Sequence, residues 1–375
     1  MNKDRKLGLL CVSKGFGGLE MNTLKLAKWL QEKGWEVSVM VAENSETAKR
    51  AHDYCNSVFT MPLKDDFFGR QKQKSMRRWL GAFPAPVVFI THNKDIALGA
   101  AYKRRYDRHL KLVYQQHMQV GVNKKDFLHT RRYNMLDLWI APLDYLKAET
   151  MQRTAVPEAR IKVIPLGVET GRFIQNDIPQ QEARTKLDLP KDKKIFGVLG
   201  RIDPKKGQDF LIGATKKLRD DYHTDYHLLI MGAVTPHEGN EHLDSLYKMV
   251  KDYALEDRVH FRESTPQVEL FYSAIDVFAM PSFGETYGMV TLEAMAAGKP
   301  VIGTNRDGTK ELLQGGKLGY VYELSDTDGF CKQLIALLDD KNIVQLIDAA
   351  RNEVLGKYTK EVMMQQLDEI LNDLL

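Results

Sequence analysis

The chain has 375 residues, of which 43% are hydrophobic and 28% charged, enough for two domains with sizeable cores. No apolar run reaches membrane-spanning length, and the first one is too short for a secretory signal, so we expect neither. Cys11, Cys55 and Cys331 are far apart, which argues against a disulfide framework or a zinc site and favours a reducing, cytosolic setting.

The net charge of +4 conceals an asymmetry between the two halves of the chain. Residues 1–165 hold 29 Lys and Arg against 16 Asp and Glu, a net charge of +13. Residues 166–375 hold 25 against 34, a net charge of −9. The halves are therefore expected to have separate tasks, with an anionic partner for the first.

Short apolar runs that alternate with helical patterns predict a doubly wound α/β sheet in the first half. The helix Glu20–Lys33 should connect the first two strands. The expected strands are Leu7–Val12, Val37–Val41, Val58–Met61, Val87–Ile90, Leu112–Tyr114, Leu138–Ala141 and Ile161–Ile164.

A glycine-rich loop, residues 13–19, follows the first strand at the edge where doubly wound sheets bind ligands. Gly15, Gly17 and Gly18 resemble half of a dinucleotide fingerprint, but Glu20 stands where a third glycine is needed. The loop is thus either a phosphate-binding turn or a tight turn with no ligand.

Residues 63–86 combine basic and aromatic side chains. A helix of this composition can lie on an anionic membrane surface or bind an anionic acceptor; the alternative is an ordinary solvated helix. Nucleic-acid binding is not expected, because no recognised module is present. The candidate acceptor or membrane contacts are Arg70, Lys72, Lys74, Arg77, Arg78 and Trp79, with Lys124 further along the chain.

Two histidines, His92 and His117, follow predicted strands and so fall where a site would lie. A lone histidine is more often structural than functional. His117 also precedes a glycine-containing loop with the basic pair Lys124 and Lys125.

The second half repeats the alternation of strands and helices. The expected strands are Ile195–Leu199, Leu228–Gly232, Val259–Phe261, Val277–Met280 and Val301–Ile302. The expected helices are Gln208–Leu218, Glu241–Tyr253, Gln267–Ser273, Thr286–Ala297 and an amphipathic last helix, Val362–Leu375.

Two carboxylates seven residues apart, Glu285 and Glu293, lie between the strands Val277–Met280 and Val301–Ile302. A helix N-terminus suits a phosphate, and a carboxylate can accept hydrogen bonds from vicinal hydroxyls. The alternative is a charge at the helix dipole and a solvated helix face. Glu293 has apolar neighbours, however, so its charge needs a partner.

A second loop, Gly200 to Gly207, follows the strand Ile195–Leu199. Arg201 and Lys206 place two cations at the mouth of a strand–helix turn. Arginine offers a planar fork and lysine a point charge, so the pair could clamp a pyrophosphate.

Together, Glu-x7-Glu and the Gly-Arg-x4-Lys-Gly loop resemble the donor-binding signatures of retaining glycosyltransferases of family 4, which have the GT-B fold. The resemblance implies an α/β protein with two Rossmann-like doubly wound domains facing a central cleft. It implies transfer of a hexose or N-acetylhexosamine, with retention, from a nucleotide sugar to a hydroxyl of a glycan, lipopolysaccharide or lipid-linked acceptor. A UDP-sugar is the first candidate donor and GDP-mannose the second.

The same resemblance assigns roles to residues. Catalysis would involve His117, Glu285, Arg201 and Lys206, with Glu293 reading the ribose. The departing phosphate would itself take the acceptor's proton. The donor would be bound by Gly17, Gly18, Gly200, Arg201, Lys206, Arg262, Glu285, Thr286, Tyr287, Gly288, Met289, Val290 and Glu293.

The resemblance also divides the chain. Residues 1–168 would bind the acceptor, 169–190 would be a linker, 191–358 would bind the donor, and 359–375 would form a helix crossing back to the first domain. Leu166 replaces a common Asn, and Asp307-Gly308 replaces a common Gly-Gly, so close backbone approach is in more doubt at Asp307.

No metal cofactor is expected, because the short Asp326-Thr-Asp328 reads as a helix cap. The basic first half predicts a cytoplasmic protein, peripheral at the inner face of the membrane, with an anionic or lipid-linked acceptor. Two alternatives stay open. One is an inactive protein that binds nucleotide sugars or glycans, and the other is an NAD-dependent dehydrogenase using Gly15 to Gly18 with Glu43.

Overall fold

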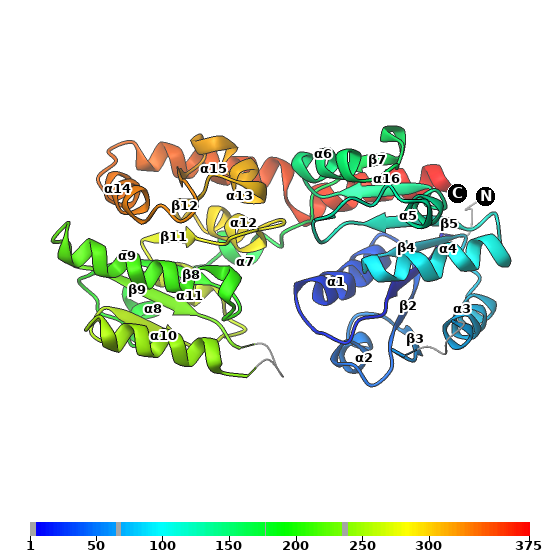
Figure 1. Ribbon diagram of the computed structural model, residues 1–375, viewed down its shortest axis with the longest axis horizontal. Helices are drawn as coiled ribbons and strands as arrows, with labels where there is room; N and C mark the ends of the chain where they lie inside the picture. The colour runs from blue at the N-terminus through cyan, green and yellow to red at the C-terminus, as the bar shows by residue number, and fades with distance from the viewer. Residues whose placement is uncertain (1–4, 65–68, 177, 235–238) are drawn as a thin grey trace. The chain divides into compact units, whose positions relative to one another are not determined.

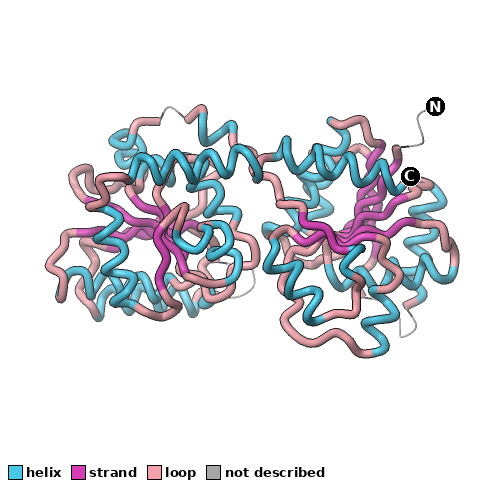
Figure 2. Tube along the Cα trace, turned by 90° about the horizontal axis from the view of Figure 1, so that it is seen from above, coloured by secondary structure: helices cyan, strands magenta, loops and turns pink. Residues whose placement is uncertain are grey.

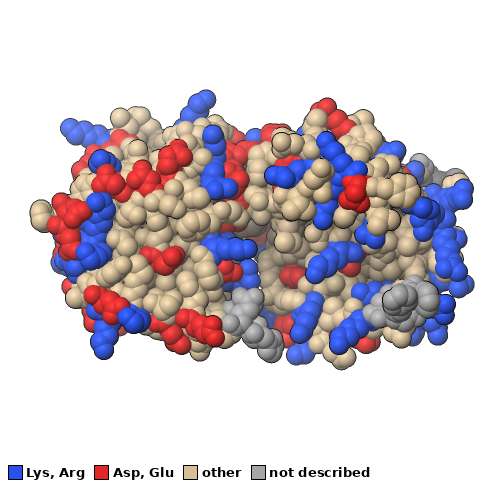
Figure 3. Space-filling model, in the orientation of Figure 1, with Lys and Arg blue, Asp and Glu red and all other residues tan. Residues whose placement is uncertain are grey.

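The computed structural model describes residues 5–64, 69–176, 178–234 and 239–375. The chain divides into two compact units, each built on one sheet (Figure 1). The first unit is Met1–Pro165 with Glu361–Leu375, and the second is Leu166–Lys360. On the face drawn in Figure 3, Lys and Arg gather over the first unit, whereas Asp and Glu are more frequent over the second.

The first unit has a seven-stranded sheet in the order β3-β2-β1-β4-β5-β6-β7, with every neighbouring pair parallel. Its central strands are buried on both faces, which is why they read as continuous apolar runs. The strands are β1 Lys6–Cys11, β2 Glu36–Ala42, β3 Ser57–Met61, β4 Val87–Ile90, β5 Lys111–Gln115, β6 Leu138–Ala141 and β7 Ile161–Val163. All seven expected strands are confirmed within one or two residues.

Helices cover both faces of each sheet (Figure 2). Those of the first unit are α1 Gly18–Glu32, α2 Glu46–Ala51, α3 Arg70–Ala82, η1 Asn93–Asp95, α4 Ile96–Arg105, α5 Phe127–Tyr133, α6 Asp144–Arg153, η2 Glu158–Arg160 and α16 Lys360–Leu374. Within the described ranges, none of the helices is long and apolar enough to cross a bilayer.

The second unit has a six-stranded parallel sheet in the order β10-β9-β8-β11-β12-β13, the strand order of a Rossmann fold. Its strands are β8 Lys194–Leu199, β9 Tyr226–Met231, β10 Val259–Arg262, β11 Val277–Met280, β12 Val301–Thr304 and β13 Tyr320–Tyr322. Its helices are α7 Gly171–Ile174, α8 Gln180–Lys186, η3 Pro204–Lys206, α9 Gln208–Asp220, α10 Glu241–Asp252, α11 Glu269–Ala274, α12 Met289–Ala296, α13 Asp307–Leu312, η4 Gln314–Gly316, α14 Thr327–Leu338 and α15 Ile343–Lys357.

The divisions along the chain differ from the expected ones in two places. The first unit ends at Pro165, three residues before the expected boundary, and residues 169–190 belong to the second unit, where a linker was expected. The last helix, α16, belongs to the first unit. There Asp368 pairs with Arg5 and accepts a hydrogen bond of 2.7 Å from Trp35 Nε1.

The helix α8 is held by a buried guanidinium. Arg184, whose side chain is only 3% exposed, pairs with Asp276 at 2.8 Å and donates to the backbone oxygens of Ala274, Lys191 and Lys193, each at 2.9 Å. The 169–190 segment therefore carries an ion pair in the interior, which a flexible linker would not do.

We predict that Arg184→Met destabilises the second unit by about 3 kcal/mol, because it leaves the mostly buried Asp276 carboxylate without its nearest cation. All four tryptophans lie in the first unit, so urea unfolding should shift more by circular dichroism than by tryptophan emission. Lys186→Met is the control, since its pair with Glu182 is half exposed and should be worth under about 1 kcal/mol. Equal effects of the two substitutions would contradict the prediction.

Candidate active site

The order of strands in the second sheet reverses between β8 and β11. Crossovers leave these two neighbours toward opposite sides, which opens a crevice beyond their carboxyl ends. The segments that occupy this edge are residues 200–207, after β8, and 281–288, after β11. Both motifs singled out in the sequence thus meet at one place.

Close packing joins these two segments. Gly207 has φ +71°, a left-handed conformation, and a Cβ there would lie 2.7 Å from the carbonyl oxygen of Pro281. The N–H of Phe283 donates to the carbonyl oxygen of Lys205 at 3.0 Å. The glycine that closes the phosphate-loop motif is therefore needed to seat that loop against the end of β11.

A charged pair completes the junction. Lys206 Nζ lies 2.8 Å from Glu285 Oε2, with side chains 31% and 14% exposed. Arg201 lies on the same loop with its Nη2 3.8 Å from Asp203 Oδ2, and its side chain is 54% exposed. Two cations and two carboxylates are thus gathered where a pyrophosphate and a sugar hydroxyl could be bound together.

The helix of the Glu-x7-Glu motif begins later than expected. α12 starts at Met289, three residues after the predicted start, because Gly288 has φ +90° and the residues before it form a loop. The helix N-terminus, with the N–H groups that a helix leaves without internal partners, therefore lies at residues 288–290. This is the position at which a phosphate would be bound.

A second glycine supports the same loop. A Cβ on Gly308 would lie 3.0–3.1 Å from the carbonyl oxygens of residues 285, 286 and 287, and Gly308 N donates to Glu285 O at 3.1 Å. Asp307 has φ +50°, a conformation that glycine adopts most easily and that Asp tolerates better than most residues. The Asp-Gly pair therefore preserves the backbone path that Gly-Gly would follow.

The side chain of Tyr287 is buried and hydrogen-bonded within the protein. It is 5% exposed, and its hydroxyl donates to the carbonyl oxygen of Leu166 at 2.6 Å. Burial raises its pKa well above the usual value. Any contact between this residue and a donor would therefore involve its backbone. Thr286 and Val290, also predicted donor contacts, are partly exposed on the same segment.

Glu293 has the partner that its apolar neighbourhood requires. The hydroxyl of the buried Tyr272 donates to Glu293 Oε2 at 2.9 Å and is also 3.1 Å from the carbonyl oxygen of Val290. Burial, and then the Glu293 charge, raise the pKa of Tyr272 well above its usual value. The need for a partner could be read from the sequence, but Tyr272 could not be identified from it.

Arg262 lines a hollow of about 460 Å³ at the carboxyl ends of β9 and β10, together with Phe261 and Tyr247. Its guanidinium points to another element, since it donates to the carbonyl oxygens of Leu187 and Asp188. The backbone and aromatic rings of this hollow, more than the Arg262 charge, are available to a flat ligand.

In the first unit, the glycine-rich loop ends in a cap. Gly17 N donates to Glu20 Oε2 at 2.9 Å, and Glu20 is 7% exposed. The residue that replaces the third glycine of a dinucleotide fingerprint therefore satisfies its own helix terminus. A Cβ on Gly18 would meet nothing within 4 Å, so a role for Gly17 and Gly18 in phosphate approach stays a prediction.

His117 follows β5, and its Nε2 lies 3.2 Å from Gln115 Oε1. Burial, and then the neighbouring His92, lower the pKa of His117 to about 4. A neutral imidazole can exchange hydrogen bonds with a sugar hydroxyl but contributes no charge at neutral pH. His117 and Glu285 belong to different units, and the joint role predicted for them stays a prediction.

The prediction for Trp79 is wrong. Its indole is completely buried, it donates to Ser38 Oγ at 2.9 Å, and it fills the space left by the absent side chain of Gly8. α3 turns Met76, Trp79 and Leu80 into the core, so a membrane or acceptor would meet its basic face alone. Arg70, Lys74, Arg77 and Arg78 are exposed, and Lys72 and Lys124 are partly so.

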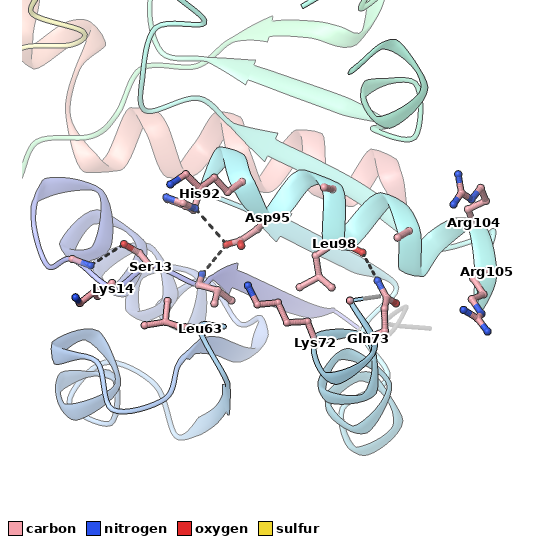
Figure 4. A pocket seen from close by; sticks show the side chains of 16 residues that line it. Ser13, Lys14, Leu63, Lys72, Gln73, His92, Asp95, Leu98, Arg104 and Arg105 are labelled. Atoms are coloured by element: carbon pink, nitrogen blue, oxygen red, sulfur yellow. Dashed lines mark hydrogen bonds and ion pairs between the residues drawn. The ribbon is translucent and has the colours of Figure 1, made fainter. Parts of the chain in front are cut away.

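A pocket of about 800 Å³ lies at the corresponding reversal of the first sheet, between β1 and β4 (Figure 4). Of its lining, Gly15, Lys72 and His92 are candidates from the sequence, whereas Ser13, Lys14 and Asp95 are not. Their position after strands β1 and β4 was the available signal. In the described part of the chain, no group of three or more His, Cys, Asp or Glu could hold a metal ion.

Comparison with known families agrees with this geometry. A family model described as glycosyl transferases group 1 matches residues 179–361, and one described as glycosyltransferase family 4 matches residues 16–172. Together the two models cover most of the chain. The chain belongs to glycosyltransferase family 4. The resemblance drawn from the two motifs is confirmed, and the dehydrogenase alternative is set aside.

Relatives of this family 4 chain include lipopolysaccharide core biosynthesis glycosyltransferase LpsE of Rhizobium meliloti, 29% identical over 212 residues, or 56% of this chain and 57% of LpsE. Lipopolysaccharide 1,2-N-acetylglucosaminetransferase of Salmonella typhimurium is 29% identical over 235 residues, or 61% of this chain and 60% of that enzyme. The similarity thus spans about three fifths of the length of these relatives.

Among solved structures, Alr3699/HepE of Anabaena in complex with UDP and glucose superposes with a TM-score of 0.83 at 20% identity, covering 98% of this chain and 99% of HepE. This likeness concerns the fold. The family 4 chain has the GT-B fold, with two Rossmann-like parallel sheets, as expected.

The first unit of the family 4 chain should show two opposite responses to acid. The unfolded pKa of a histidine is about 6.5 and that of an aspartate about 3.9. His117, with a folded pKa of about 4, costs stability as pH falls below about 6.5. Asp95, whose pKa burial raises to about 7, adds stability as pH falls through about 7.

Between pH 7.5 and 5.5, His117→Gln should therefore lose about 1 kcal/mol less stability than the parent, and Asp95→Asn about 1–2 kcal/mol more. Urea unfolding followed by tryptophan emission measures this, because all four tryptophans lie in the first unit. His109→Gln, at an exposed position, is the control and should match the parent. The same slope in all four proteins would exclude the proposed burial effects.

Proposed function

We propose that the chain is a retaining glycosyltransferase that transfers a hexose or N-acetylhexosamine from a nucleotide sugar to a hydroxyl group. The donor is a UDP-sugar, with GDP-mannose as the second candidate. The acceptor is a glycan, a lipopolysaccharide or a lipid-linked sugar. The observation that carries the proposal is the Lys206–Glu285 pair at the sheet reversal of the second unit, where both family motifs meet.

The proposed chemistry assigns a task to each group. The leaving nucleoside diphosphate gains negative charge as the glycosidic bond breaks, and Lys206, Arg201 and the N-terminus of α12 would stabilise that charge without a metal. The anomeric carbon becomes cationic, so the sugar must be held by its hydroxyls, a role for Glu285 with His117. The departing phosphate would take the acceptor's proton, on the analogy with the family.

The nucleoside would occupy the remainder of the second unit's edge. Glu293, fixed by Tyr272, offers a carboxylate for the ribose hydroxyls. The hollow beside Phe261 and Tyr247 offers flat apolar surface for the base. The relatives named above act in lipopolysaccharide synthesis, and HepE binds UDP, which supports the choice of donor and acceptor.

Thermal-shift binding of UDP, GDP, ADP and NAD in EDTA tests the donor site. We expect one nucleoside diphosphate to stabilise the protein and Lys206→Ala to weaken its binding at least tenfold, because a charge-assisted contact to phosphate is worth about 1.5–3 kcal/mol. Lys205→Ala, an exposed lysine on the same loop, should bind as the parent does.

Stabilisation by NAD alone, or by none of the four in either EDTA or Mg²⁺, would refute the donor site. A turnover assay then supplies the preferred UDP- or GDP-sugar with lipopolysaccharide fragments as acceptors. Binding without turnover in this assay would favour the alternative of an inactive protein that binds nucleotide sugars. Nucleoside diphosphate binding that appears only when Mg²⁺ replaces EDTA would contradict metal independence and not the donor site.

We further propose that the first unit docks on an anionic membrane surface through the segment 118–132, not through 63–86. Helix α5 buries no residue, and Met118, Val122, Phe127 and Leu128 are 53%, 59%, 73% and 59% exposed. Apolar side chains exposed together with basic ones are typical of interfacial binding. The flanking cations are Lys124, Lys125, Arg131 and Arg132.

Co-sedimentation with vesicles of phosphatidylglycerol and phosphatidylcholine at low salt measures this docking. Phe127→Ser with Leu128→Ser should lower the bound fraction at least tenfold, since inserting each side chain is worth about 1.5–3 kcal/mol. Val344→Ser, which changes a valine that is 64% exposed in the second unit, is the matched control. Absence of binding by the parent protein would refute the membrane proposal.

A further inference from the structure

The pocket at the reversal of the first sheet is formed by loops and two helices (Figure 4). Val12 and Ser13 follow β1, and His92 and Asp95 follow β4, so the floor of the pocket lies at the carboxyl ends of neighbouring strands. Helices α3 and α4 contribute the walls. This is the edge where doubly wound sheets bind ligands. None of the residues assigned to the donor lines the pocket, although Gly17 and Gly18 follow on the same loop.

The lining of this pocket is strongly cationic. In the described part of the chain, no carboxylate forms an ion pair with four of its cations, whereas lysines on α9 such as Lys216 and Lys217 pair with aspartates one turn away. Cations that outnumber the carboxylates among the described lining residues, where Asp95 is the one acid, favour an anionic ligand. Five cations line the pocket, namely Lys14, Lys72, Lys94, Arg104 and Arg105. The four without an ion pair to a described carboxylate are Lys14, Lys94, Arg104 and Arg105.

The floor of the pocket offers a different chemistry. Asp95 is 5% exposed, and its Oδ2 accepts a hydrogen bond of 2.7 Å from the N–H of Val12 and lies 3.9 Å from His92 Nδ1. That imidazole nitrogen is buried and has no hydrogen-bond partner among the described residues. Buried polar atoms are rarely left in this state, so a ligand hydroxyl beside Asp95 would satisfy this nitrogen after a turn of the His92 ring brings it to the pocket.

We propose that this pocket binds a phosphate-bearing sugar acceptor, with a hydroxyl at His92 and Asp95 and the phosphate against the cations along α4. The inference rests on the proposed function and names the acceptor class. Asp95 and Arg104 are nine residues apart on a helical path, or about 14 Å. That span exceeds one sugar ring, so the acceptor is a disaccharide phosphate or a lipid-linked sugar phosphate.

The far end of the pocket strengthens the choice of phosphate. Arg104 also lines a neighbouring hollow of about 350 Å³ together with Arg131 and Arg132. Guanidinium groups match the oxygens of a phosphate with paired hydrogen bonds. Several cations around one place suit a dianion better than a single carboxylate.

Titration calorimetry with trehalose 6-phosphate and with trehalose tests the inference directly. We expect the phosphorylated sugar to bind at least tenfold more tightly than the neutral one. Arg104→Gln with Arg105→Gln should remove this preference, and Lys94→Gln should weaken it. Arg108→Gln, which changes an exposed arginine close to the end of α4 that lines neither hollow, should leave it intact.

Equal binding of trehalose, or an equal loss in Arg108→Gln, would overturn the proposal. Vesicles containing phosphatidylinositol phosphate provide the second arm. If Arg104→Gln with Arg105→Gln weakens only the binding to vesicles, the phosphate belongs to a lipid. If the protein binds neither the sugar phosphate nor the vesicles, the site is rejected.

The donor site is checked in the same samples. Nucleoside diphosphate binding that persists in Arg104→Gln with Arg105→Gln shows that the variant is folded and that its loss is local. Phosphate-dependent binding in the absence of any nucleotide binding would support the pocket while refuting the proposed transferase, so the two failures can be distinguished.

Discussion

The reversal of strand order in each parallel sheet is the constraint on which the rest of the molecule depends. In strands that are buried on both faces, the backbone groups pair with neighbouring strands and the side chains are apolar, so polar side chains gather beyond the strand ends. Between β8 and β11 this edge holds Lys206 and Glu285, and between β1 and β4 it holds His92 and Asp95. Each unit thus has its polar side chains at the point where the strand order reverses, but the charges gathered there differ.

Most of the fold could be predicted from the sequence, because buried parallel strands are recognisable as short apolar runs between helices. The helix boundaries were less secure. α12 begins at Met289 and not at Thr286, because the left-handed Gly288 ends a loop that local helix propensity does not reveal. The assignment of 169–190 as a linker relied on polar composition. Composition says nothing of Arg184, whose partner Asp276 is 92 residues away.

The candidate site was predicted unevenly for the same reason. Residues in motifs, such as Lys206 and Glu285, could be found by spacing, whereas Tyr272 and Asp95 could not, because their importance comes from contacts with residues 21 and 83 positions away in the chain. Trp79 shows the opposite error. An aromatic residue in a basic helix suggested a membrane contact, but helical periodicity turns it into the core beside Gly8.

The placement of α16 has a consequence for synthesis of the chain. The first unit begins the sequence but is completed by residues 361–375, where Asp368 binds Arg5 and Trp35. During translation the whole second unit, Leu166–Lys360, leaves the ribosome before that last helix. The first unit therefore cannot complete its fold, and part of its apolar surface stays uncovered, until residues 361–375 have been synthesised. The order of folding need not follow the order of the sequence.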